Sequence, residues 1–294
     1  MPARIAAVVC TFNRAESLRR TLVSLQALDL PPDQFEVLIV DNGSTDDTGK
    51  VAQSFCSVPR FRYLVEADAG LSRARNRAWR ETDADLVAYI DDDAVASKRW
   101  LSCALAALLE LPQIGCVGGR TLPLWETKRP RWLTDDLLMY LSTVDWSPAP
   151  RVLAPDEWLV GTNIAFRRDL LERMGGFRED LGRIGKRLYS MEDIDAQRKV
   201  QSIGMNRFYD PHMEVAHYVP AQRATRGWFV RRCFFQGVSR ARMIGSDNGR
   251  LAGSLQITPR VRAAAARSLS GGAFSMLCRT AELSGFLSGV VRLK

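Results

Sequence analysis

Three consecutive carboxylates, Asp91, Asp92 and Asp93, follow the apolar run DLVAYI at residues 85–90. Like charges in a row repel one another and add nothing to a hydrophobic core, although an acidic turn after a strand can also lack any chemical role. If the chain stays extended, Asp91 and Asp93 point to one side and Asp92 to the other. Two carboxylates on one side form an oxygen site for a hard divalent cation, Mg²⁺ or Mn²⁺. The stretch therefore predicts a metal site that could clamp a diphosphate.

A second acidic turn follows the apolar run FEVLIV at residues 35–40. It begins at Asp41 in DNGSTDD, with Gly43 and the start of an expected helix close behind. An acid at a strand end before a glycine and a helix N-terminus is typical of sites that hold a nucleoside, although DNGS is also an ordinary turn. No GxGxxG motif follows a strand, and no GxxxxGKS or GxxxxGKT motif occurs. Dinucleotide dehydrogenases and P-loop NTPases therefore find no support here.

The hydrophobic pattern predicts a scaffold that brings these polar stretches together. Apolar runs that fit strands alternate with helical patterns at intervals of about 25–30 residues. The expected strands are residues 5–10, 35–40, 61–67 and 85–90. This alternation predicts an α/β fold with a doubly wound, mostly parallel sheet, where ligands bind at the carboxyl ends of the strands. The stretches CTFNR (10–14), DNGSTDD (41–47) and DDD (91–93) should then meet at one edge of the sheet.

Local signals predict where further elements begin. Asn13 with Glu16, and Ser44 with Asp47, are expected to cap the first two helices. Beyond residue 100 we expect a strand at 161–166, a helix at 191–204 and extended chain at 207–219, where the two histidines, His212 and His217, lie. His212 follows Asp210-Pro211 and is expected in a turn.

Seven stretches of the chain, in order and with matching spacing, resemble those of family 2 glycosyltransferases of the GT-A fold. They are VVCTFNRAESLRRTLVSL, VLIVDNGSTDDT, GLSRARNRAW, LVAYIDDDA, GTNIAFRRDLLERMGGF, MEDIDAQRKV and VAHYV, and they cover about residues 4–220. One departure is Cys10, where many members have proline, at a position expected to contribute only backbone. The resemblance implies a Rossmann-like GT-A domain. It also implies metal-dependent, inverting transfer of a sugar from a UDP, GDP or dTDP donor to a hydroxyl of a polysaccharide, lipid-linked or natural-product acceptor.

The resemblance also implies roles for individual residues. Thr11, Phe12, Asn13 and Arg14 would lie beside the base, and Asp41 would hydrogen-bond it. Asp91 would meet the ribose, with Asp92 in the same nucleotide-binding stretch, and Asp93 would ligate Mg²⁺ or Mn²⁺. Gly161, Thr162 and Asn163 would form a floor under the donor sugar. Two of these residues could also have a purely structural role. Arg75 would hold the nucleotide or its phosphates, or it could lie on a solvated helix face. His217 would complete the metal site, or it could be a structural histidine.

The pair Glu192-Asp193 is the candidate catalytic machinery. An inverting transfer needs a carboxylate that takes the proton of the acceptor hydroxyl on the face opposite the leaving diphosphate. The pair opens an expected helix, where the dipole favours a charged carboxylate, although an acidic pair also simply stabilises a helix start. Because the resemblance places the family's ED motif here, we interpret Asp193 as the base and Glu192 as the residue that steers the acceptor or donor sugar. The sequence would equally allow the reverse.

Basic charge is concentrated at the C-terminal end. The chain of 294 residues has a net charge of +8, but residues 222–294 hold 13 Lys and Arg against two acids, which leaves residues 1–221 slightly acidic. This change predicts a catalytic domain at 1–221 and a basic, mainly helical segment at 222–294. Its stretches WFVRRCFFQGVSRARMI and AELSGFLSGVV fit helices on an anionic membrane surface, or helices packed on the catalytic domain. No signal peptide or membrane span is expected, so we predict a cytoplasmic protein. Of the two arrangements of the C-terminal helices, the first would make it peripheral on the inner membrane face, and the sequence leaves both open.

Two other functions remain open from the residues themselves. A sugar-phosphate nucleotidyltransferase would share the layered α/β plan but needs a glycine- and basic-rich loop after the first strand, which CTFNRAES is not. A nonenzymatic nucleic-acid-binding protein would use the basic tail, but no base-reading motif accompanies it, so no nucleic-acid partner is expected. The six cysteines form no CxxC pair and predict neither a zinc site nor a disulfide framework.

Overall fold

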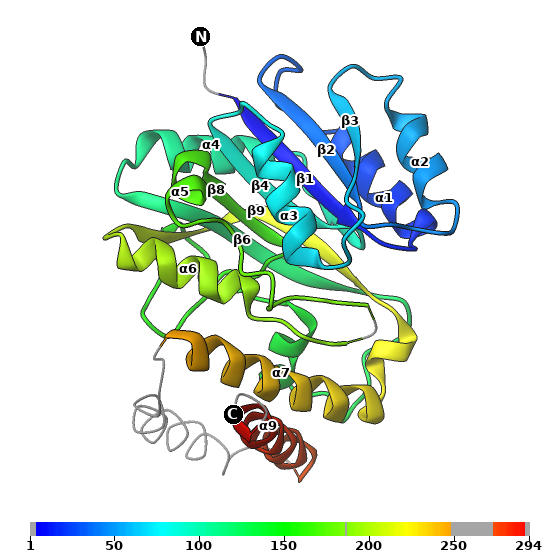
Figure 1. The fold of residues 1–294 in the computed structure, drawn as a ribbon, viewed down its shortest axis with the longest axis vertical. Helices are drawn as coiled ribbons and strands as arrows, with labels where there is room; N and C mark the ends of the chain where they lie inside the picture. The colour runs from blue at the N-terminus through cyan, green and yellow to red at the C-terminus, as the bar shows by residue number, and fades with distance from the viewer. Residues whose placement is uncertain (1–3, 186, 248–272, 292–294) are drawn as a thin grey trace. The chain divides into compact units, whose positions relative to one another are not determined.

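The computed structural model describes residues 4–185, 187–247 and 273–291. Strands and helices alternate through the first hundred residues, as the hydrophobic pattern predicts (Figure 1). The elements are β1 (Ile5–Thr11), α1 (Ala15–Gln26), β2 (Phe35–Asp41), α2 (Thr48–Phe55), β3 (Phe61–Val65), α3 (Leu71–Arg80), β4 (Leu86–Asp91), β5 (Ala94–Ala96) and α4 (Trp100–Glu110).

The remaining elements differ widely in length, from the two residues of β7 to the 22 residues of α7. They are β6 (Ile114–Trp125), η1 (Asp135–Leu141), β7 (Arg151–Val152), β8 (Asn163–Arg167), α5 (Arg168–Arg173), α6 (Glu192–Ser202), β9 (Asn206–Val219), η2 (Ala221–Ala224), α7 (Arg226–Asp247) and α9 (Ala273–Val291). The expected helix at 191–204 and the expected extended chain at 207–219 are therefore confirmed as α6 and β9. His212 lies inside β9, so its expected place in a turn is wrong.

A central sheet joins the strands in the order β3-β2-β1-β4-β8-β6-β9-β5, with β7 paired to β9. β1 runs parallel to both β2 and β4, and β2 runs parallel to β3, whereas β8 runs antiparallel to β4 and β6. The register sets Thr11 opposite Asp41 and Cys10 opposite Asp91. The polar stretches after β1, β2 and β4 therefore do meet at one sheet edge, as predicted.

Helices cover both faces of this sheet, because alternate residues of the buried strands point to opposite sides. On one face α1, α2 and α4 pack against strand residues such as Val9, Ile39 and Ile90. On the other face α3 and α6 pack against Val8, Val40 and Tyr89. This doubly wound arrangement confirms the predicted α/β fold.

The two predicted helix caps are wrong. Arg14 occupies the N-cap position of α1 and makes no side-chain cap, whereas Asn13 has a left-handed φ of 52° and accepts a 2.7 Å hydrogen bond from Thr45 N. The second helix begins at Thr48, and Asp46 Oδ1 accepts the Thr48 amide at 3.0 Å. The predicted caps Asn13 and Ser44 instead bind each other's loops, because Ser44 Oγ accepts the Asn13 amide at 2.9 Å, a long-range contact that the local sequence pattern does not reveal.

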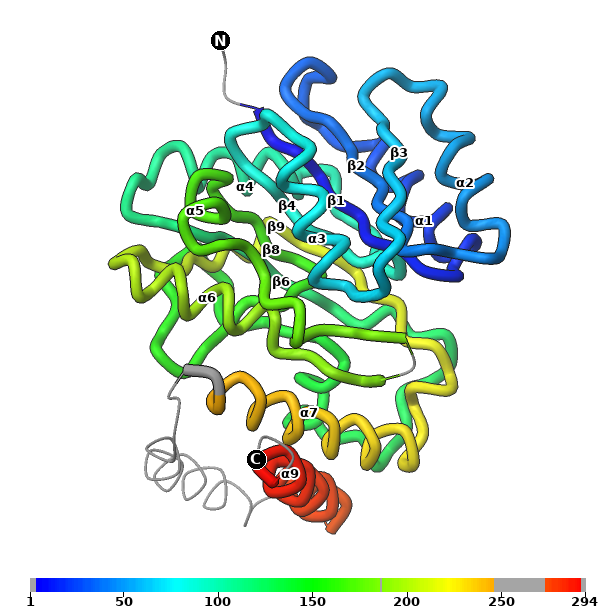
Figure 2. The backbone as a smooth tube through the Cα atoms, in the orientation of Figure 1, coloured from blue at the N-terminus to red at the C-terminus, as the bar shows by residue number. Residues whose placement is uncertain are grey.

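The chain divides into two compact units. The first unit contains residues 1–124, 142–179 and 192–218, and the second contains 125–141, 180–191 and 219–294. The core of the second unit includes Leu137, Phe229 and Cys278, and α7 and α9 lie side by side within it (Figure 2). The predicted domain boundary at 221 stays a prediction. Within the described residues, we find no helix with both the length and the apolar character needed to cross a bilayer.

Candidate active site

A candidate metal site lies where β4 ends. Asp91 is the last residue of β4, and the chain then turns into β5, whose Ala94 pairs with His217 of β9. This pairing sets His217 Nε2 at 3.1 Å from Asp93 Oδ1. Asp91, Asp93 and His217 each offer one ligand atom, and these atoms lie within 4.8 Å of one another. The structure thus brings together the two carboxylates and the histidine that the sequence proposed separately.

Asp92 does not point away from this site, and the assumption of extended chain at residues 91–93 is wrong. The chain turns at Asp92 and Asp93, and Asp92 is 5% exposed. Its carboxylate accepts 2.8 Å hydrogen bonds from Thr11 Oγ1 and Arg14 Nη1. Burial raises the pKa of Asp92 to about 6, although the positive charge of Arg14 opposes this rise. Asp92 therefore links the end of β4 to the loop after β1.

Arg14 binds the acidic stretch rather than projecting freely from its loop. Its Nη1 lies 2.8 Å from both Asp92 Oδ1 and Asp93 Oδ2. The negative charge of Asp92, and to a smaller extent that of Asp93, raises the pKa of Arg14. Because Arg14 occupies Oδ2 of Asp93, the oxygen beside His217 is Oδ1. One guanidinium thus reduces the repulsion between two carboxylates and orients the one in the candidate metal site.

The predicted base-binding residues lie together at the ends of β1 and β2. Asp41 accepts hydrogen bonds from Ser44 N at 2.8 Å and from Tyr63 Oη at 2.9 Å. Burial raises the pKa of Tyr63 to about 12, and Asp41 contributes to this rise, so Tyr63 stays a donor. Asn13 links this loop to the loop after β1, and Phe12 is 47% exposed. Phe12 therefore presents a free aromatic surface beside a rigid polar edge.

Arg75 is a buried ion-pair centre, which excludes the alternative of a solvated helix face. Arg75 is 2% exposed. Its guanidinium donates hydrogen bonds to Glu192 Oε1 at 3.0 Å, to Gly161 O at 3.1 Å and to Asp91 Oδ1 at 3.4 Å. Burial alone would lower the pKa of Arg75, but Glu192 and Asp91 outweigh burial and raise it. Arg75 thus connects the candidate metal site to the start of α6.

The two acids that open α6 differ in their surroundings. Asp193 accepts backbone hydrogen bonds from Gly161 N at 2.8 Å and from Ile194 N at 2.9 Å. Burial, with a contribution from Glu192, raises the pKa of Asp193 to about 6. Glu192 is 6% exposed, and its Oε2 is a buried oxygen with no hydrogen-bond partner among the described residues. The carboxylate of Asp193 is therefore fixed by two backbone amides and has a pKa of about 6. Glu192 keeps one oxygen that can still accept a hydrogen bond.

The stretch Gly161-Thr162-Asn163 divides between the site and the core. A Cβ on Gly161 would lie 2.8 Å from Arg75 Nη2, so glycine allows the guanidinium to approach the backbone. Thr162 Oγ1 accepts the Asp91 amide at 3.4 Å. Asn163 is fully buried, and its carboxamide bonds Trp100 Nε1, Arg120 O and Met213 O. Gly161 and Thr162 thus border the candidate site, whereas the side chain of Asn163 cross-links the core.

Two positioning residues escaped the sequence reasoning. Tyr63 holds Asp41, and Gln197 binds both the amide and the carbonyl of Leu159 while donating to Asp193 O at 3.0 Å. Gln197 thereby ties α6 to the chain that leads into Gly161. Its spacing of one helical turn from Asp193 was a usable signal, as was the parallel register of β2 and β3 for Tyr63.

The family profile described as glycosyl transferase family 2 matches residues 6–175, more than half of the chain. The chain belongs to this family. Family 2 membership and the likeness to solved glycosyltransferases confirm the GT-A fold and an enzyme that transfers glycosyl groups. The nucleotidyltransferase alternative thereby loses its basis.

Several known proteins are similar to this family 2 chain. It is 27% identical over 241 residues to the glucosyl-dolichyl phosphate glucuronosyltransferase of Haloferax volcanii, covering 81% of this chain and 76% of that protein. It is 28% identical over 225 residues to the validoxylamine A glucosyltransferase of Streptomyces hygroscopicus, covering 68% of this chain and 48% of that protein. Among solved structures, the mannosyltransferase PcManGT from Pyrobaculum calidifontis, in complex with GDP-Man and Mn²⁺, superposes with a TM-score of 0.65 at 21% identity, covering 99% of this chain and 88% of that one.

Proposed function

We propose that this family 2 enzyme transfers a sugar, with inversion and with a divalent cation, from a nucleoside-diphosphate sugar to an acceptor hydroxyl. One observation carries the proposal. Arg75 bonds both Asp91, at the candidate metal site, and Glu192, in the acidic pair that opens α6. One buried guanidinium therefore links a candidate cation ligand to the acidic pair, although residues 91 and 192 are far apart in sequence.

Asp91, Asp93 and His217 fit a divalent cation. The 3.1 Å between Asp93 Oδ1 and His217 Nε2 equals the separation of two adjacent ligands on one ion, about 3 Å for bonds of about 2.1 Å. When bound, Mn²⁺ or Mg²⁺ would supply the positive charge that stabilises the departing diphosphate. The imidazole ligand favours Mn²⁺, because Mg²⁺ prefers an all-oxygen shell.

The donor would lie along the edge formed by β1, β2 and β4. The exposed ring of Phe12 offers a surface on which a base can stack, beside Asp41 and the loop that Asn13 holds. Thr11 and Arg14 would act on the donor indirectly, because their hydrogen bonds hold the carboxylates of Asp92 and Asp93 in place. Gly161 and Thr162 would face the sugar, and UDP, GDP and dTDP are the candidate nucleotides.

Asp193 would take the proton of the acceptor hydroxyl. An alcohol is a poor nucleophile near neutral pH, and general-base help contributes about 10²–10⁴ in rate. A pKa of about 6 leaves Asp193 ionised at pH 7 and still basic enough to accept a proton. The Gly161 and Ile194 amides hold its two oxygens, which fixes the direction of approach. Glu192, fixed by Arg75, would direct its spare oxygen to a sugar hydroxyl.

Titration with nucleotides tests this proposal. UDP, GDP and dTDP are each added to the full chain with Mn²⁺, with Mg²⁺ and with EDTA, and binding is measured by calorimetry. We expect one nucleotide to bind only when a cation is present, and Mn²⁺ to serve better than Mg²⁺. Binding that EDTA leaves unchanged would contradict the metal dependence, and no binding of any nucleotide would contradict the donor class.

We also propose the cytoplasm as the compartment, and an anionic membrane surface as a partner of residues 222–294. The positive balance of that segment supports the partner, because each Lys or Arg near an anionic surface contributes about 1 kcal/mol.

A further inference from the structure

Helix α9 in the second unit buries its small residues and exposes its large ones. The side of α9 that is buried contains Ser275, Cys278, Gly285 and Gly289. The opposite side carries Met276, Leu283, Leu287 and Val290, which are 39–57% exposed. Their spacings of seven, four and three residues place these four side chains, the α9 face, on one side of the helix. A helix in water normally does the reverse, as α1 does by burying Leu18, Leu22 and Leu25.

Close packing against α7 explains why α9 buries small residues. A Cβ on Gly285 would collide with the backbone of Phe234, and a Cβ on Gly237 would collide with the backbone of Glu282. A Cβ on Gly289 would lie 2.7 Å from the Ala241 Cβ. Contact through small residues, with large apolar residues turned outward, is how helices pair where lipid surrounds them. The α7–α9 pair therefore presents a fixed apolar surface to its surroundings.

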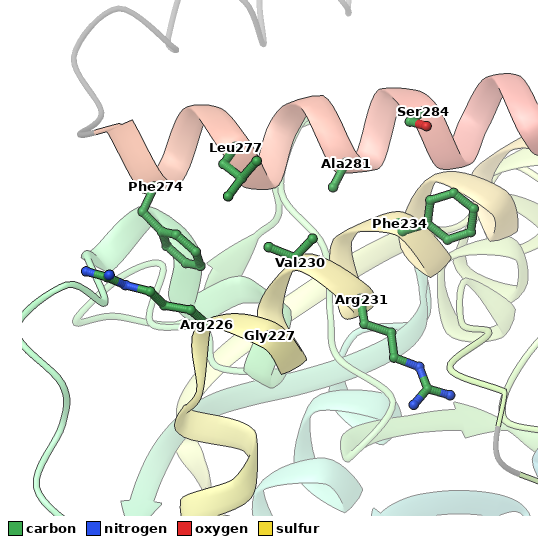
Figure 3. Close-up of a pocket in the computed structure, with 9 residues that line it drawn as sticks. All are labelled: Arg226, Gly227, Val230, Arg231, Phe234, Phe274, Leu277, Ala281 and Ser284. Atoms are coloured by element: carbon green, nitrogen blue, oxygen red, sulfur yellow. The ribbon is translucent and has the colours of Figure 1, made fainter.

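An apolar groove continues this surface between the two helices (Figure 3). It has a volume of about 730 Å³, and its lining includes Val230, Phe234, Leu277 and Ala281, with Phe274 and Arg226 at one end. Arg226 is exposed, and its guanidinium lies 5.6 Å from the centre of the Phe274 ring. A hydrocarbon chain could fill this groove while an anionic group meets Arg226.

Charge decides among the partners that could cover the α9 face. Residues 222–294 carry a balance of +11, so two copies of this segment would repel each other. Residues 248–272 contain four arginines and no acid, so they share the sign of Arg226. An anionic lipid surface complements both the charge and the apolar side chains. Because no described helix can cross a bilayer, α9 would lie in the plane of the surface.

We propose that the second unit binds the surface of an anionic phospholipid bilayer, with the α9 face inserted among the acyl chains and Arg226 at the headgroups. This deepens the proposed membrane partner of residues 222–294 by naming the contact. It rests on none of the catalytic assignments, so either can fail without the other.

Vesicle co-sedimentation of the full chain tests the proposal. The vesicles are phosphatidylcholine alone, or an equimolar mixture of phosphatidylcholine and phosphatidylglycerol. We expect strong partitioning to the mixed vesicles at low salt, weak partitioning to neutral vesicles, and loss of binding as salt screens the charges. Leu287→Glu and Leu283→Glu should each lower the partition coefficient at least about tenfold, because each replaces an apolar side chain that inserts among the acyl chains with a charged one. Arg226→Gln should lower it about fivefold, for the mixed vesicles only.

Matched controls separate the α9 face from general effects. Leu109→Glu makes the same change at a leucine of α4 that is 50% exposed, and it should leave partitioning unchanged. Circular dichroism checks that each variant folds, and Leu287→Gln replaces Leu287→Glu if the charged variant does not. Equal binding to neutral and mixed vesicles, no binding to either, or an equal effect of Leu109→Glu would overturn the proposal. So would a wild-type dimer in sedimentation velocity that Leu287→Glu or Leu287→Gln converts to a monomer, because the face would then pair with a second copy.

Discussion

Arg75 donates a hydrogen bond of 3.0 Å to Glu192 Oε1, although 117 positions of sequence separate the two residues. The same guanidinium reaches Asp91 and the Gly161 carbonyl, and its carbon lies 5.5 Å from the centre of the Phe177 ring. Burying the charges of Arg75 and Glu192 costs solvation free energy, which their mutual attraction and the nearby, partly exposed Asp91 must offset. The arrangement therefore depends on all three partners, and α3, β4 and α6 are coupled through it.

Loss of Arg75 should destabilise the protein. In Arg75→Met, Glu192 keeps a buried carboxylate without its counter-charge, and we expect a loss of about 3–5 kcal/mol in the free energy of unfolding. Arg75→Lys should recover only part of this, because an ammonium cannot bridge two carboxylates and a carbonyl with the planar geometry of a guanidinium. Urea unfolding followed by circular dichroism measures both.

Arg77 on the same helix provides the control. Its side chain is 45% exposed and pairs with Glu81 one turn away, so Arg77→Met should cost no more than about 1 kcal/mol. If Arg75→Met and Arg77→Met lowered the free energy of unfolding equally, the buried ion pairs of Arg75 would contribute no more to stability than an exposed pair.

Asp193→Asn should abolish transfer but preserve donor binding. The amide cannot accept the proton of the acceptor hydroxyl, so kcat should fall at least about a hundredfold while metal-dependent nucleotide affinity stays within about twofold. Glu192→Gln should cost less in kcat, because Gln keeps an oxygen for Arg75. Steady-state kinetics and calorimetry on the same preparations separate the two effects. Normal turnover by Asp193→Asn with a dead Glu192→Gln would reverse the roles, and two active variants would refute the site.

Activity should fall in acid as Asp193 becomes protonated. Its pKa is raised to about 6, and the base works only as the carboxylate, so kcat/KM should decrease as the pH drops through about 6 and level off above about 7. Asp92 has a raised pKa of similar size, so the profile of the wild type alone does not identify the group. Glu192→Gln removes a negative neighbour that raises the Asp193 pKa, and it should move the acid limb to lower pH. If the acid limb of the Glu192→Gln profile stays at the same pH, the group that titrates there is a residue other than Asp193.

Removal of a metal ligand should weaken cation binding specifically. His217→Ala should reduce Mn²⁺ affinity in the presence of nucleotide at least about tenfold. Asp93→Ala should abolish activity yet leave the fold intact, because Arg14 keeps its bond to Asp92. His212→Ala is the matched control, since His212 is the other histidine and its side chain is 53% exposed. If His212→Ala weakened Mn²⁺ binding as much as His217→Ala, the assignment of His217 would fail.

The hydrophobic pattern of the sequence is enough to predict the sheet edge at which the site forms. Apolar runs of strand length, each followed by polar residues, place those residues at the carboxyl ends of parallel strands. The structure adds the register, which sets Thr11 opposite Asp41 and Cys10 opposite Asp91. The start of α6 at Glu192 was equally readable, because acids favour the first turn of a helix. These features depend on neighbours along the chain or on strand period, which sequence records directly.

The partners of individual side chains follow from the packed fold and cannot be predicted from the local sequence. Helix α3 carries Arg73, Arg75, Arg77 and Arg80, and nothing local distinguishes the one that packs under Gly161 and Glu192 from those that face solvent. Asn13 has a capping partner in sequence yet bonds Thr45, and Asn163 resembles a site residue yet bonds the core. His217 meets Asp93, 124 positions away in sequence, because β5 pairs with β9. Burial and long-range hydrogen bonds depend on which elements cover a residue, and that is a property of the packed fold and not of its neighbours in sequence.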